Sequence, residues 1–225
     1  MQEQITEKVE QPNFILRFKR PADPESNRVL IMIHGWTGDE NVMWIFARSM
    51  PADYWILAPR GTIIAPEGGF GWAKVVPGRS PSLREFETAA SALLEKIDRW
   101  CSQMHIQSDT YSLMGFSQGA ILAYAISLLY PRRVNAVAAL AGYVPTSWLD
   151  DQAGNSLKRK RFYVAHGRQD ETVPVDLARN TVKALELNGA EVNYCESDAG
   201  HRLSMSCLHG LEDFFSQVSG HEPGK

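Results

Sequence analysis

The stretch Leu113–Leu122, LMGFSQGAIL, decides the fold that we expect for this chain. It places Ser117 between Gly115 and Gly119, with an apolar run before the serine and an alanine-rich run after it. Such runs are typical of a buried strand followed by a helix. At a sharp strand-to-helix turn of the GxSxG type, the serine hydroxyl projects from the end of a sheet, and the glycines avoid a Cβ collision across the turn. The stretch therefore predicts a nucleophilic serine, although so short a pattern also arises by chance in ordinary loops.

Outward from this turn, short apolar runs alternate with longer amphipathic runs, as in a mostly parallel sheet with helices on both faces. The expected strands cover residues 13–18, 28–34, 55–59, 111–114, 134–140, 161–165 and 191–195. The expected helices cover residues 39–50, 82–104, 117–130, 175–188 and 205–218. The helix at 82–104 begins with a capping box formed by Ser82 and Glu85. Residues 60–81 form a long loop rich in glycine, proline and aromatic residues, and the fold class that follows is α/β.

The length of the chain predicts one domain with a substantial core. The chain has 225 residues, of which 44% are hydrophobic, and it contains no internal repeat or low-complexity linker. We expect a single domain over residues 1–225, with flexible tails at residues 1–11 and 219–225. Residues 142–160, between two expected strands, are too few to form a separate lid domain.

The composition excludes several function classes. The formal net charge is -3 and the pI is near 6.1, so we expect no general attraction to nucleic acid or to an anionic membrane. No segment approaches the roughly 20 apolar residues that span a bilayer, and the polar N-terminal residues do not resemble a secretory signal. Cys101, Cys195 and Cys207 are too few and too scattered for a disulfide framework or a zinc site. We therefore expect a cytoplasmic protein that acts on a small-molecule partner and does not insert stably into a membrane. We expect no metal or cofactor, and a homodimer is compatible with the sequence.

A serine hydroxyl needs a neighbouring base, and His201 is the strongest candidate. It lies in the small-residue loop SDAGH, residues 197–201, directly after an expected strand. The remaining histidines lie before the serine, at a strand end, inside a helix or in the C-terminal tail, where this role is less suitable. They are His34, His105, His166, His209 and His221.

Asp170 is the candidate for the acid that orients this histidine. In GxSxG turns of this kind the groups follow the chain order serine, acid, histidine. Asp170 lies in RFYVAHGRQDETVP, residues 161–174, after an expected strand and a glycine. A turn or cap role is the alternative for this aspartate. Its rivals as the acid are Asp150, Asp151, Glu171 and Asp198. Ser117, Asp170 and His201 together predict a catalytic triad.

Two backbone N–H groups are expected to form an oxyanion hole. The first belongs to Gln118, since the first N–H groups of a helix lack internal partners. The second comes from the loop HGWTGDE, residues 34–40, where Trp36 is the first choice and Thr37 the second. His34 is expected to shape this loop by hydrogen bonding, without a chemical role.

The motifs HGWTGDE, GFSQGA, HGRQDETVP and AGH, in this order over nearly the whole chain, resemble those of the α/β-hydrolase superfamily. Within it they look most like the phospholipase/carboxylesterase group, which includes bacterial carboxylesterases and acyl-protein thioesterases. GFSQG and HGxxDxxVP together are specific, whereas GxSxG alone is not. The resemblance implies an α/β-hydrolase fold, the triad Ser117, Asp170 and His201, and the oxyanion donors Trp36 and Gln118.

Two departures from the group's pattern fall where a substrate should touch the protein. Trp36 stands where the thioesterases usually have leucine, and the stretch AKVV after Trp72 lacks the group's usual acidic residue. Phe70, Trp72 and Trp148 are candidates to line an apolar trough for an acyl chain; core packing or loop anchoring is the alternative role of each ring. These features predict a serine esterase for short-to-medium acyl esters.

Other functions remain compatible with the same scaffold. A lysophospholipase, an acyl thioesterase or a peptidase would use the same three groups. A ligand-binding homologue without catalysis would be expected to have lost part of the triad, and all three members are present here.

Overall fold

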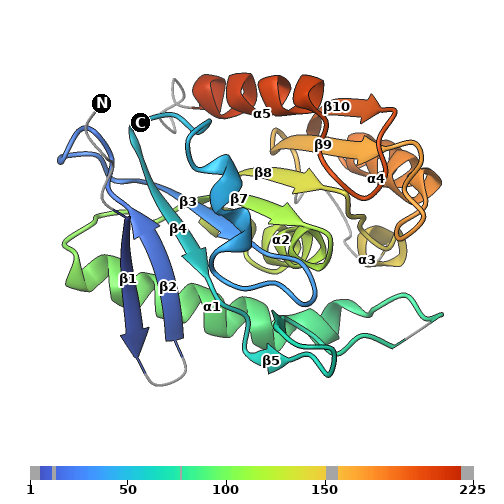
Figure 1. Ribbon diagram of the computed structural model, residues 1–225. Helices are drawn as coiled ribbons and strands as arrows, with labels where there is room; N and C mark the ends of the chain where they lie inside the picture. The colour runs from blue at the N-terminus through green and yellow to red at the C-terminus, as the bar shows by residue number, and fades with distance from the viewer. Residues whose placement is uncertain (1–5, 12–13, 77, 151–156, 219–225) are drawn as a thin grey trace.

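In the computed structural model, which describes residues 6–11, 14–76, 78–150 and 157–218, one large sheet forms the centre of the molecule (Figure 1). Its strand order is β1-β2-β4-β3-β7-β8-β9-β10. Strands β1 and β2 run antiparallel to their neighbours, and the pairs from β4 through to β10 are parallel. The bounds of these strands are Thr6–Gln11 (β1), Phe14–Lys19 (β2), Arg28–Ile33 (β3), Tyr54–Pro59 (β4), Tyr111–Phe116 (β7), Val134–Leu140 (β8), Arg161–Gly167 (β9) and Glu191–Ser197 (β10).

Helices cover both faces of the sheet. The α-helices are α1 Leu83–Gln103, α2 Gln118–Leu129, α3 Ser147–Asp150, α4 Val175–Leu187 and α5 Met205–Val218. Short 3-10 helices cover Val42–Phe46 (η1) and Pro131–Arg133 (η2), and a small hairpin joins Ile63–Ile64 (β5) to Phe70–Gly71 (β6). Side chains of α1, α2 and α4 share one hydrophobic cluster, whereas those of η1 and α5 share another. The sheet therefore separates two cores.

The local sequence explains the two helices nearest the site. The N–H of Ser82 donates to the Glu85 carboxylate at 2.7 Å, so α1 begins with the capping box that the sequence predicted. The buried side chains of α1 recur at helical spacing, which leaves its other face in contact with solvent. Helix α2 is buried along almost its whole length, because it contacts α1 on one side and strands β3, β7 and β8 on the other.

The helix expected at residues 39–50 is wrong in its extent. Only Val42–Phe46 is helical, and it is a 3-10 helix. The side chain of Asp39 accepts the Asn41 N–H at 2.8 Å, and such local side-chain bonds compete with α-helix formation. Glu40 is fully buried and faces Arg60, which also holds this segment in an irregular course.

The tail expected at residues 1–11 is wrong for its second half. Residues Thr6–Gln11 form β1, which pairs with β2 in the register that places Val9 opposite Leu16. The charged residues of TEKVEQ concealed this strand, although charged side chains are a common feature of edge strands. The remaining expected tail residues, 1–5 and 219–225, lie outside the described part of the chain.

The prediction made from the number and spacing of the cysteines missed one disulfide. Cys195 and Cys207 form a disulfide between the end of β10 and the start of α5, and Cys101 is a buried free cysteine. The pair was not predictable from the sequence, because the two residues come together only through the packing of α5 beside β10. Within the described residues, no helix is long and apolar enough to cross a bilayer.

Candidate active site

Ser117 lies at the turn between β7 and α2, at the carboxyl end of a central strand. Its backbone angles are φ 52° and ψ -116°, a conformation that non-glycine residues rarely adopt. The N–H of Ser117 donates to the Leu140 carbonyl at 2.9 Å, and its carbonyl accepts the Ala120 N–H at 2.9 Å. This strained strand-to-helix turn is the one that the GxSxG pattern predicts.

The two glycines of the pattern are required by close backbone contacts. A Cβ atom on Gly115 would lie 2.2 Å from the Gly119 carbonyl oxygen, and one on Gly119 would lie 2.1 Å from the Ile33 carbonyl oxygen. Neither backbone neighbour can move without disturbing β3 or α2. The steric role predicted for both glycines is therefore confirmed.

His201 and Asp170 meet across the ends of two neighbouring strands. The loops after β9 and β10 carry them, and the Nδ1 atom of His201 lies 2.7 Å from Oδ2 of Asp170. The Asp170 side chain is fully buried, and its Oδ1 atom accepts the N–H groups of Thr172 and Val173 at 2.9 and 2.8 Å. One carboxylate oxygen thus fixes the turn while the other accepts the imidazole Nδ1–H, which leaves Nε2 of His201 available as a base.

The ring of His201 lies beside the Ser117 turn. Its centroid is 5.0 Å from that of Phe116, the residue before the serine. Among the described residues, the Ser117 hydroxyl makes no hydrogen bond, to His201 or to any other group. Catalytic hydrogen bonds are often long without substrate and shorten when it binds. The structure therefore brings Asp170 and His201 into direct contact, with the ring adjacent to the turn that carries Ser117.

A second histidine contacts Asp170, and sequence reasoning missed this contact. His166, at the end of β9, is fully buried; its Nε2 lies 2.8 Å from the Val173 carbonyl oxygen and 3.3 Å from Oδ2 of Asp170. His166 lies at a strand end, as expected, and it is buried there. Its spacing of four residues from Asp170 in HGRQD was the signal that could have revealed the contact.

The backbone N–H groups of Trp36 and of Gln118, the first residue of α2, lie beside Ser117 and have no hydrogen-bond partner within the described chain. The Thr37 N–H has none there either. The loop of Trp36 closely approaches the serine, because a Cβ atom on Gly35 would lie 3.2 Å from the Ser117 Cβ atom. Thr37, the second choice for a donor, is exposed, and its hydroxyl donates to the Trp36 carbonyl at 2.6 Å.

His34 shapes this loop as expected. Its Nε2 atom accepts the Gly61 N–H at 2.8 Å, and its Nδ1 atom lies 2.7 Å from the Gly35 carbonyl oxygen. Burial lowers the pKa of His34, which favours the neutral ring with Nδ1–H as donor and Nε2 as acceptor. The loop is therefore held to the residues after β4 by a buried, uncharged imidazole.

The side chain of Gln118 adds a role that the sequence did not indicate. Its Oε1 atom accepts the Trp72 N–H at 2.8 Å, and its Nε2 atom donates to the Ala73 carbonyl at 2.8 Å. A Cβ atom on Gly71 would lie 2.3 Å from the Trp36 ring and 2.9 Å from Oε1 of Gln118. The loop that follows β4 is thus fastened to the helix that starts after Ser117.

A buried carboxylate with two partly exposed cationic partners holds the other end of the Trp36 loop. The Glu40 carboxylate accepts two hydrogen bonds from Arg60, at 2.6 and 2.7 Å, and lies 3.1 Å from the Lys8 ammonium. Burial by itself would raise the pKa of Glu40, but the hydrogen bonds from Arg60 and Lys8 outweigh it and hold the pKa at about 2. The Arg60 guanidinium also lies over the Phe70 ring, 4.6 Å from its centroid.

The three candidate substrate-binding rings differ in exposure. Phe70 is half-buried, whereas Trp72 and Trp148 are 5% and 4% exposed. The indole N–H of Trp72 donates to the His34 carbonyl, and that of Trp148 donates to the Pro81 carbonyl. Their burial favours the anchoring and packing roles for both tryptophans and leaves Phe70 as the ring with free surface.

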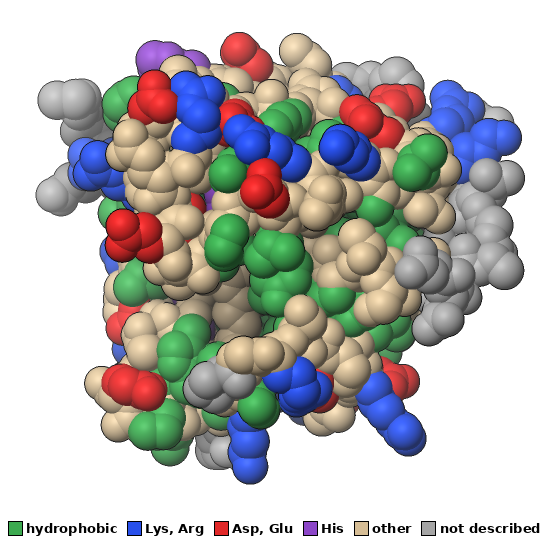
Figure 2. Space-filling model, turned by 90° about the vertical axis from the view of Figure 1, so that its right-hand side faces the viewer, with side chains coloured by type: hydrophobic (Ala, Val, Ile, Leu, Met, Phe, Trp, Pro, Cys, Tyr) green, Lys and Arg blue, Asp and Glu red, His purple; other side chains and the backbone are tan. Residues whose placement is uncertain are grey.

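The carboxyl ends of the parallel strands open on one side of the molecule. Figure 2 shows this side, where hydrophobic side chains gather around a hollow and charged side chains lie mainly around them. A separate cavity of about 320 Å³ lies between α1 and the loop after β4, with Trp72 in its wall. None of the three triad candidates lines that cavity.

Comparison with known proteins gives consistent matches. A model of the family described as Phospholipase/Carboxylesterase matches residues 15–219. A probable carboxylesterase SOBER1-like of Arabidopsis thaliana is 30% identical over 117 residues, which are 50% of this chain and 44% of that protein. Acyl-protein thioesterase 1 of Kluyveromyces lactis is 25% identical over 191 residues, which are 76% of this chain and 81% of that protein. The match to the SOBER1-like protein thus covers less than half of the length of that protein.

Solved structures share the architecture. A carboxylesterase from Mesorhizobium loti superposes with a TM-score of 0.76 at 21% identity, over 97% of this chain and 100% of that chain. Esterase PE8 superposes with a TM-score of 0.77 at 21% identity, over 89% of this chain and 97% of that chain. At this level of identity the two structures show a common fold.

Proposed function

The chain belongs to the phospholipase/carboxylesterase family, and from this premise we propose that it is a serine carboxylesterase that cleaves short-to-medium acyl esters. Its α/β-hydrolase fold and its family support ester or thioester hydrolysis as the class of reaction. The observation that carries the finer proposal is the 2.7 Å contact between His201 and the buried Asp170, beside the strained turn that presents Ser117.

The proposed reaction has two halves. Nε2 of His201 takes the proton of the Ser117 hydroxyl while the serine oxygen attacks the acyl carbonyl carbon, and the imidazolium then protonates the leaving alcohol. Water, deprotonated by the same imidazole, attacks the acyl-enzyme and releases the acid. Asp170 remains a carboxylate throughout, since its role is to orient the ring and to stabilise the imidazolium.

The unpartnered N–H groups of Trp36 and Gln118 support an oxyanion hole. Both flank the Ser117 turn, and backbone donors held in place before the reaction stabilise the charge that develops on the carbonyl oxygen. Losing one such donor typically costs about 3 kcal/mol of transition-state stabilisation. The contacts of Gly71 and Gln118 described above would keep these donors in position.

The proposed substrate is a small acyl ester with a short-to-medium acyl chain. The apolar side chains around the hollow of Figure 2 support an acyl group, and Phe70 is the candidate ring with free surface. Hydrolysis of nitrophenyl esters from acetate to dodecanoate gives the chain-length profile. We expect kcat/KM to peak at short or medium length; the same low rate at every length would contradict the proposal.

Covalent labelling tests the nucleophile directly. A fluorophosphonate probe should label the wild type at one residue, and Ser117→Ala and His201→Ala should abolish labelling and hydrolysis. Ser102→Ala, an exposed serine near the end of α1, is the matched control and should label normally. Labelling that persists in Ser117→Ala would show that another residue is the nucleophile.

Thioester hydrolysis is the second candidate, because one relative, which matches 76% of this chain, is an acyl-protein thioesterase. Turnover of an oxygen ester and a thioester with the same acyl chain separates the two. A kcat/KM more than tenfold higher for the thioester would replace the carboxylesterase assignment.

A cytoplasmic location also remains part of the proposal. The Cys195–Cys207 disulfide weighs against a permanently reducing compartment, where disulfides are rare and are usually transient or regulatory. Fractionation of cells after rapid alkylation of thiols would report both the location and the state of this disulfide there.

A further inference from the structure

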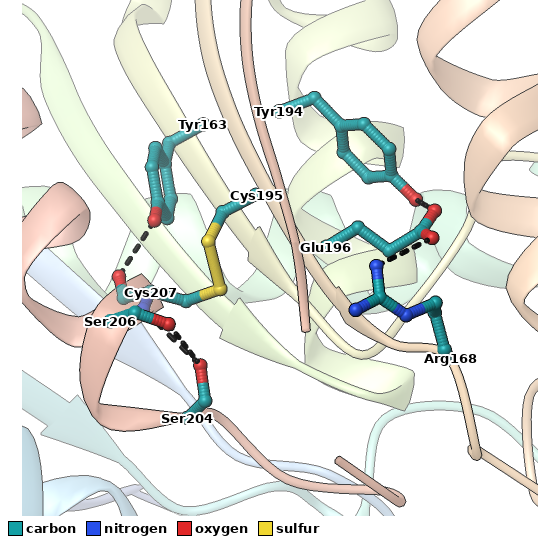
Figure 3. Close-up of a disulfide and its surroundings, with 8 residues drawn as sticks. All are labelled: Tyr163, Arg168, Tyr194, Cys195, Glu196, Ser204, Ser206 and Cys207. Carbon is teal, nitrogen blue, oxygen red and sulfur yellow. Dashed lines mark hydrogen bonds and ion pairs between the residues drawn. A yellow bond between two sulfur atoms is a disulfide. The ribbon is translucent and has the colours of Figure 1, made fainter. Parts of the chain in front are cut away.

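A disulfide joins the two ends of the loop that carries His201. Cys195 lies near the end of β10 and Cys207 in the first turn of α5, and their Cα atoms are 5.7 Å apart (Figure 3). The loop between them, residues 196–206, has His201 at its middle. The covalent bond therefore fixes the span that this loop must cover.

The first half of the loop is also held by other contacts. The Glu196 carboxylate accepts hydrogen bonds from Arg179 at 2.9 and 2.8 Å and from the Tyr194 hydroxyl at 2.7 Å. The carbonyls of Ser197 and Ala199 accept backbone N–H groups of the loop after β9, at 2.8 and 2.9 Å. This half is therefore tied to the same segment that carries Asp170.

The second half lacks comparable hydrogen bonds to other elements. In the described structure, apart from the helical hydrogen bonds within α5, the hydrogen bonds of residues 202–206 stay within residues 200–208. The Ser204 hydroxyl, for example, accepts the Cys207 N–H at 3.2 Å and lies 3.0 Å from the Ser206 hydroxyl. Leu203 is only partly buried against the core. The disulfide is thus the strongest tie between this half and β10.

Helix α5 has anchors of its own, so the fold does not depend on the disulfide. Leu211, Phe214 and Phe215 are buried in the second core, and the Tyr163 hydroxyl donates to the Cys207 carbonyl at 2.6 Å. Two thiols cannot remain at bonding distance and must separate to van der Waals contact. We therefore expect reduction to change the span of the loop and to shift His201 relative to Asp170, while both cores remain packed.

We propose that the Cys195–Cys207 disulfide is a positioning element for His201, so that the oxidised protein is the fast form of the enzyme and the reduced protein the slow form. The inference rests on the proposed esterase function. Displacement of a catalytic group by about 1 Å can lower a rate by roughly a hundredfold, so a small change in the loop is sufficient.

A dithiol reductant supplies the electrons for this change. Cys195 is half-buried on an edge strand, whereas Cys207 is fully buried, so a reductant thiolate attacks Sγ of Cys195 and Cys207 leaves as a thiolate that takes a proton. The second thiol of the reductant then attacks the reductant's other sulfur atom, which is bonded to Cys195 in this mixed disulfide. This step releases the Cys195 thiolate, which takes the second proton. Two electrons and two protons pass to the protein, and the reductant becomes a cyclic disulfide.

The third cysteine does not compete in this exchange. Cys101 is buried in α1, in the core on the opposite face of the sheet from Cys207, and burial raises the pKa of its thiol to about 11. A buried, protonated thiol is a poor nucleophile for a disulfide. The Cys101→Ser variant is therefore the matched control.

The test compares oxidised and dithiothreitol-reduced protein, with reduction verified by mass spectrometry after thiol alkylation. We expect kcat for nitrophenyl butyrate to fall roughly tenfold or more on reduction with KM within about twofold, and to return after oxidised glutathione is added to unalkylated protein. The far-ultraviolet circular dichroism should not change. The double variant Cys195→Ser/Cys207→Ser should have the kcat of the reduced form, and dithiothreitol should not change that value. Cys101→Ser should respond to dithiothreitol as the wild type does.

A spectroscopic readout keeps this inference separate from the proposed function. The downfield proton resonance of the His201 Nδ1–H, assigned by its loss in His201→Gln, should be present in the oxidised protein and weakened or shifted on reduction. An unchanged resonance and an unchanged kcat in verified reduced protein would overturn the inference. An oxidised protein that hydrolyses no ester but loses the resonance on reduction would overturn the esterase proposal and retain the positioning role of the disulfide.

Discussion

Gln118 serves the candidate site through both its backbone and its side chain. The backbone N–H is free at the start of α2, while the side chain binds Trp72 and Ala73. Because the two roles use different atoms, a side-chain substitution can separate them. The sequence predicted only the backbone role, since the partners of the side chain come from a distant loop.

We expect Gln118→Leu to weaken substrate binding more than the chemical step. The change removes both side-chain hydrogen bonds and leaves a buried N–H and a buried carbonyl unpaired, which loosens the loop after β4, but it retains the oxyanion donor. KM should rise severalfold while kcat changes by less than about threefold, and the Trp72 amide should exchange with deuterium faster. A loss confined to kcat would contradict this division of roles.

Gly71 separates the Trp36 ring from the Gln118 side chain. A methyl group there would overlap the Trp36 ring, which must move and carry its backbone N–H with it. Gly71→Ala should therefore lower kcat roughly tenfold to a hundredfold. Gly78→Ala is the control, because a methyl group at Gly78 meets open space and only its positive φ is strained; it should cost some stability and leave kcat unchanged.

At the scale of elements, the ion pair between Glu40 and Arg60 connects the Trp36 loop to the end of β4. The Glu40 side chain is fully buried and its pKa is about 2, below the value of about 4.3 expected in the unfolded chain. A depressed pKa in the folded state contributes stability that is fully present above the unfolded value and is lost as the pH falls toward 2. This connection thus makes the loop sensitive to acid.

Glu40→Gln should lower the free energy of unfolding at pH 7 by about 3 kcal/mol, because it removes the buried carboxylate that binds the partly exposed Arg60 and Lys8. It should also flatten the loss of stability between about pH 4 and pH 2. Urea unfolding at a series of pH values measures both effects. Glu85→Gln is the matched control: the pKa of Glu85 is also about 2, through Arg79 and Ser82, but its partners are at the surface, so its effect should be much smaller. Equal effects of the two substitutions would contradict the role of burial.

Across the whole molecule, the sequence predicted the inner parallel strands β3, β4, β7, β8 and β9 well, because they are nearly continuous apolar runs that are buried on both faces. The predicted strand at 134–140 and helix at 205–218 coincide with β8 and α5. Strand β1 escaped notice because it lies at an edge, where alternation with charged residues replaces an apolar run. The helix at 39–50 was too long because the prediction ignored the burial of Glu40.

The candidate site was predictable where function requires a local motif. The turn at Ser117 and the loops of Asp170 and His201 follow strands in sequence, and parallel strands end at the same edge. The contacts of His166 and of the Gln118 side chain are set by tertiary packing between loops, as is the Cys195–Cys207 pair. Spacing alone could not reveal which of the aromatic rings would be buried, so Trp72 and Trp148 were indistinguishable from Phe70.

The disulfide should also contribute to global stability. It closes a segment with a sequence separation of 12 residues, and a loop of this size restricts the unfolded chain by about 3 kcal/mol. Reduction should therefore lower the melting temperature by roughly 5 to 10 °C for a chain of this length, with the folded state retained at 25 °C. Calorimetry of oxidised, reduced and Cys195→Ser/Cys207→Ser protein measures the melting temperatures. Equal melting temperatures of the reduced and the oxidised protein would contradict this contribution of the disulfide.

The positive φ of Ser117 implies that a glycine would suit this backbone position better than the proposed nucleophile does. Positive φ with ψ near -120° suits glycine, so Ser117→Gly relieves a conformational cost of about 1 kcal/mol that Ser117→Ala retains. The glycine form should melt at the higher temperature of the two in differential scanning fluorimetry. If it does, crystals of the inactive and more stable Ser117→Gly protein could be soaked with intact esters. The acyl group bound in such a complex would identify the acyl preference of the protein.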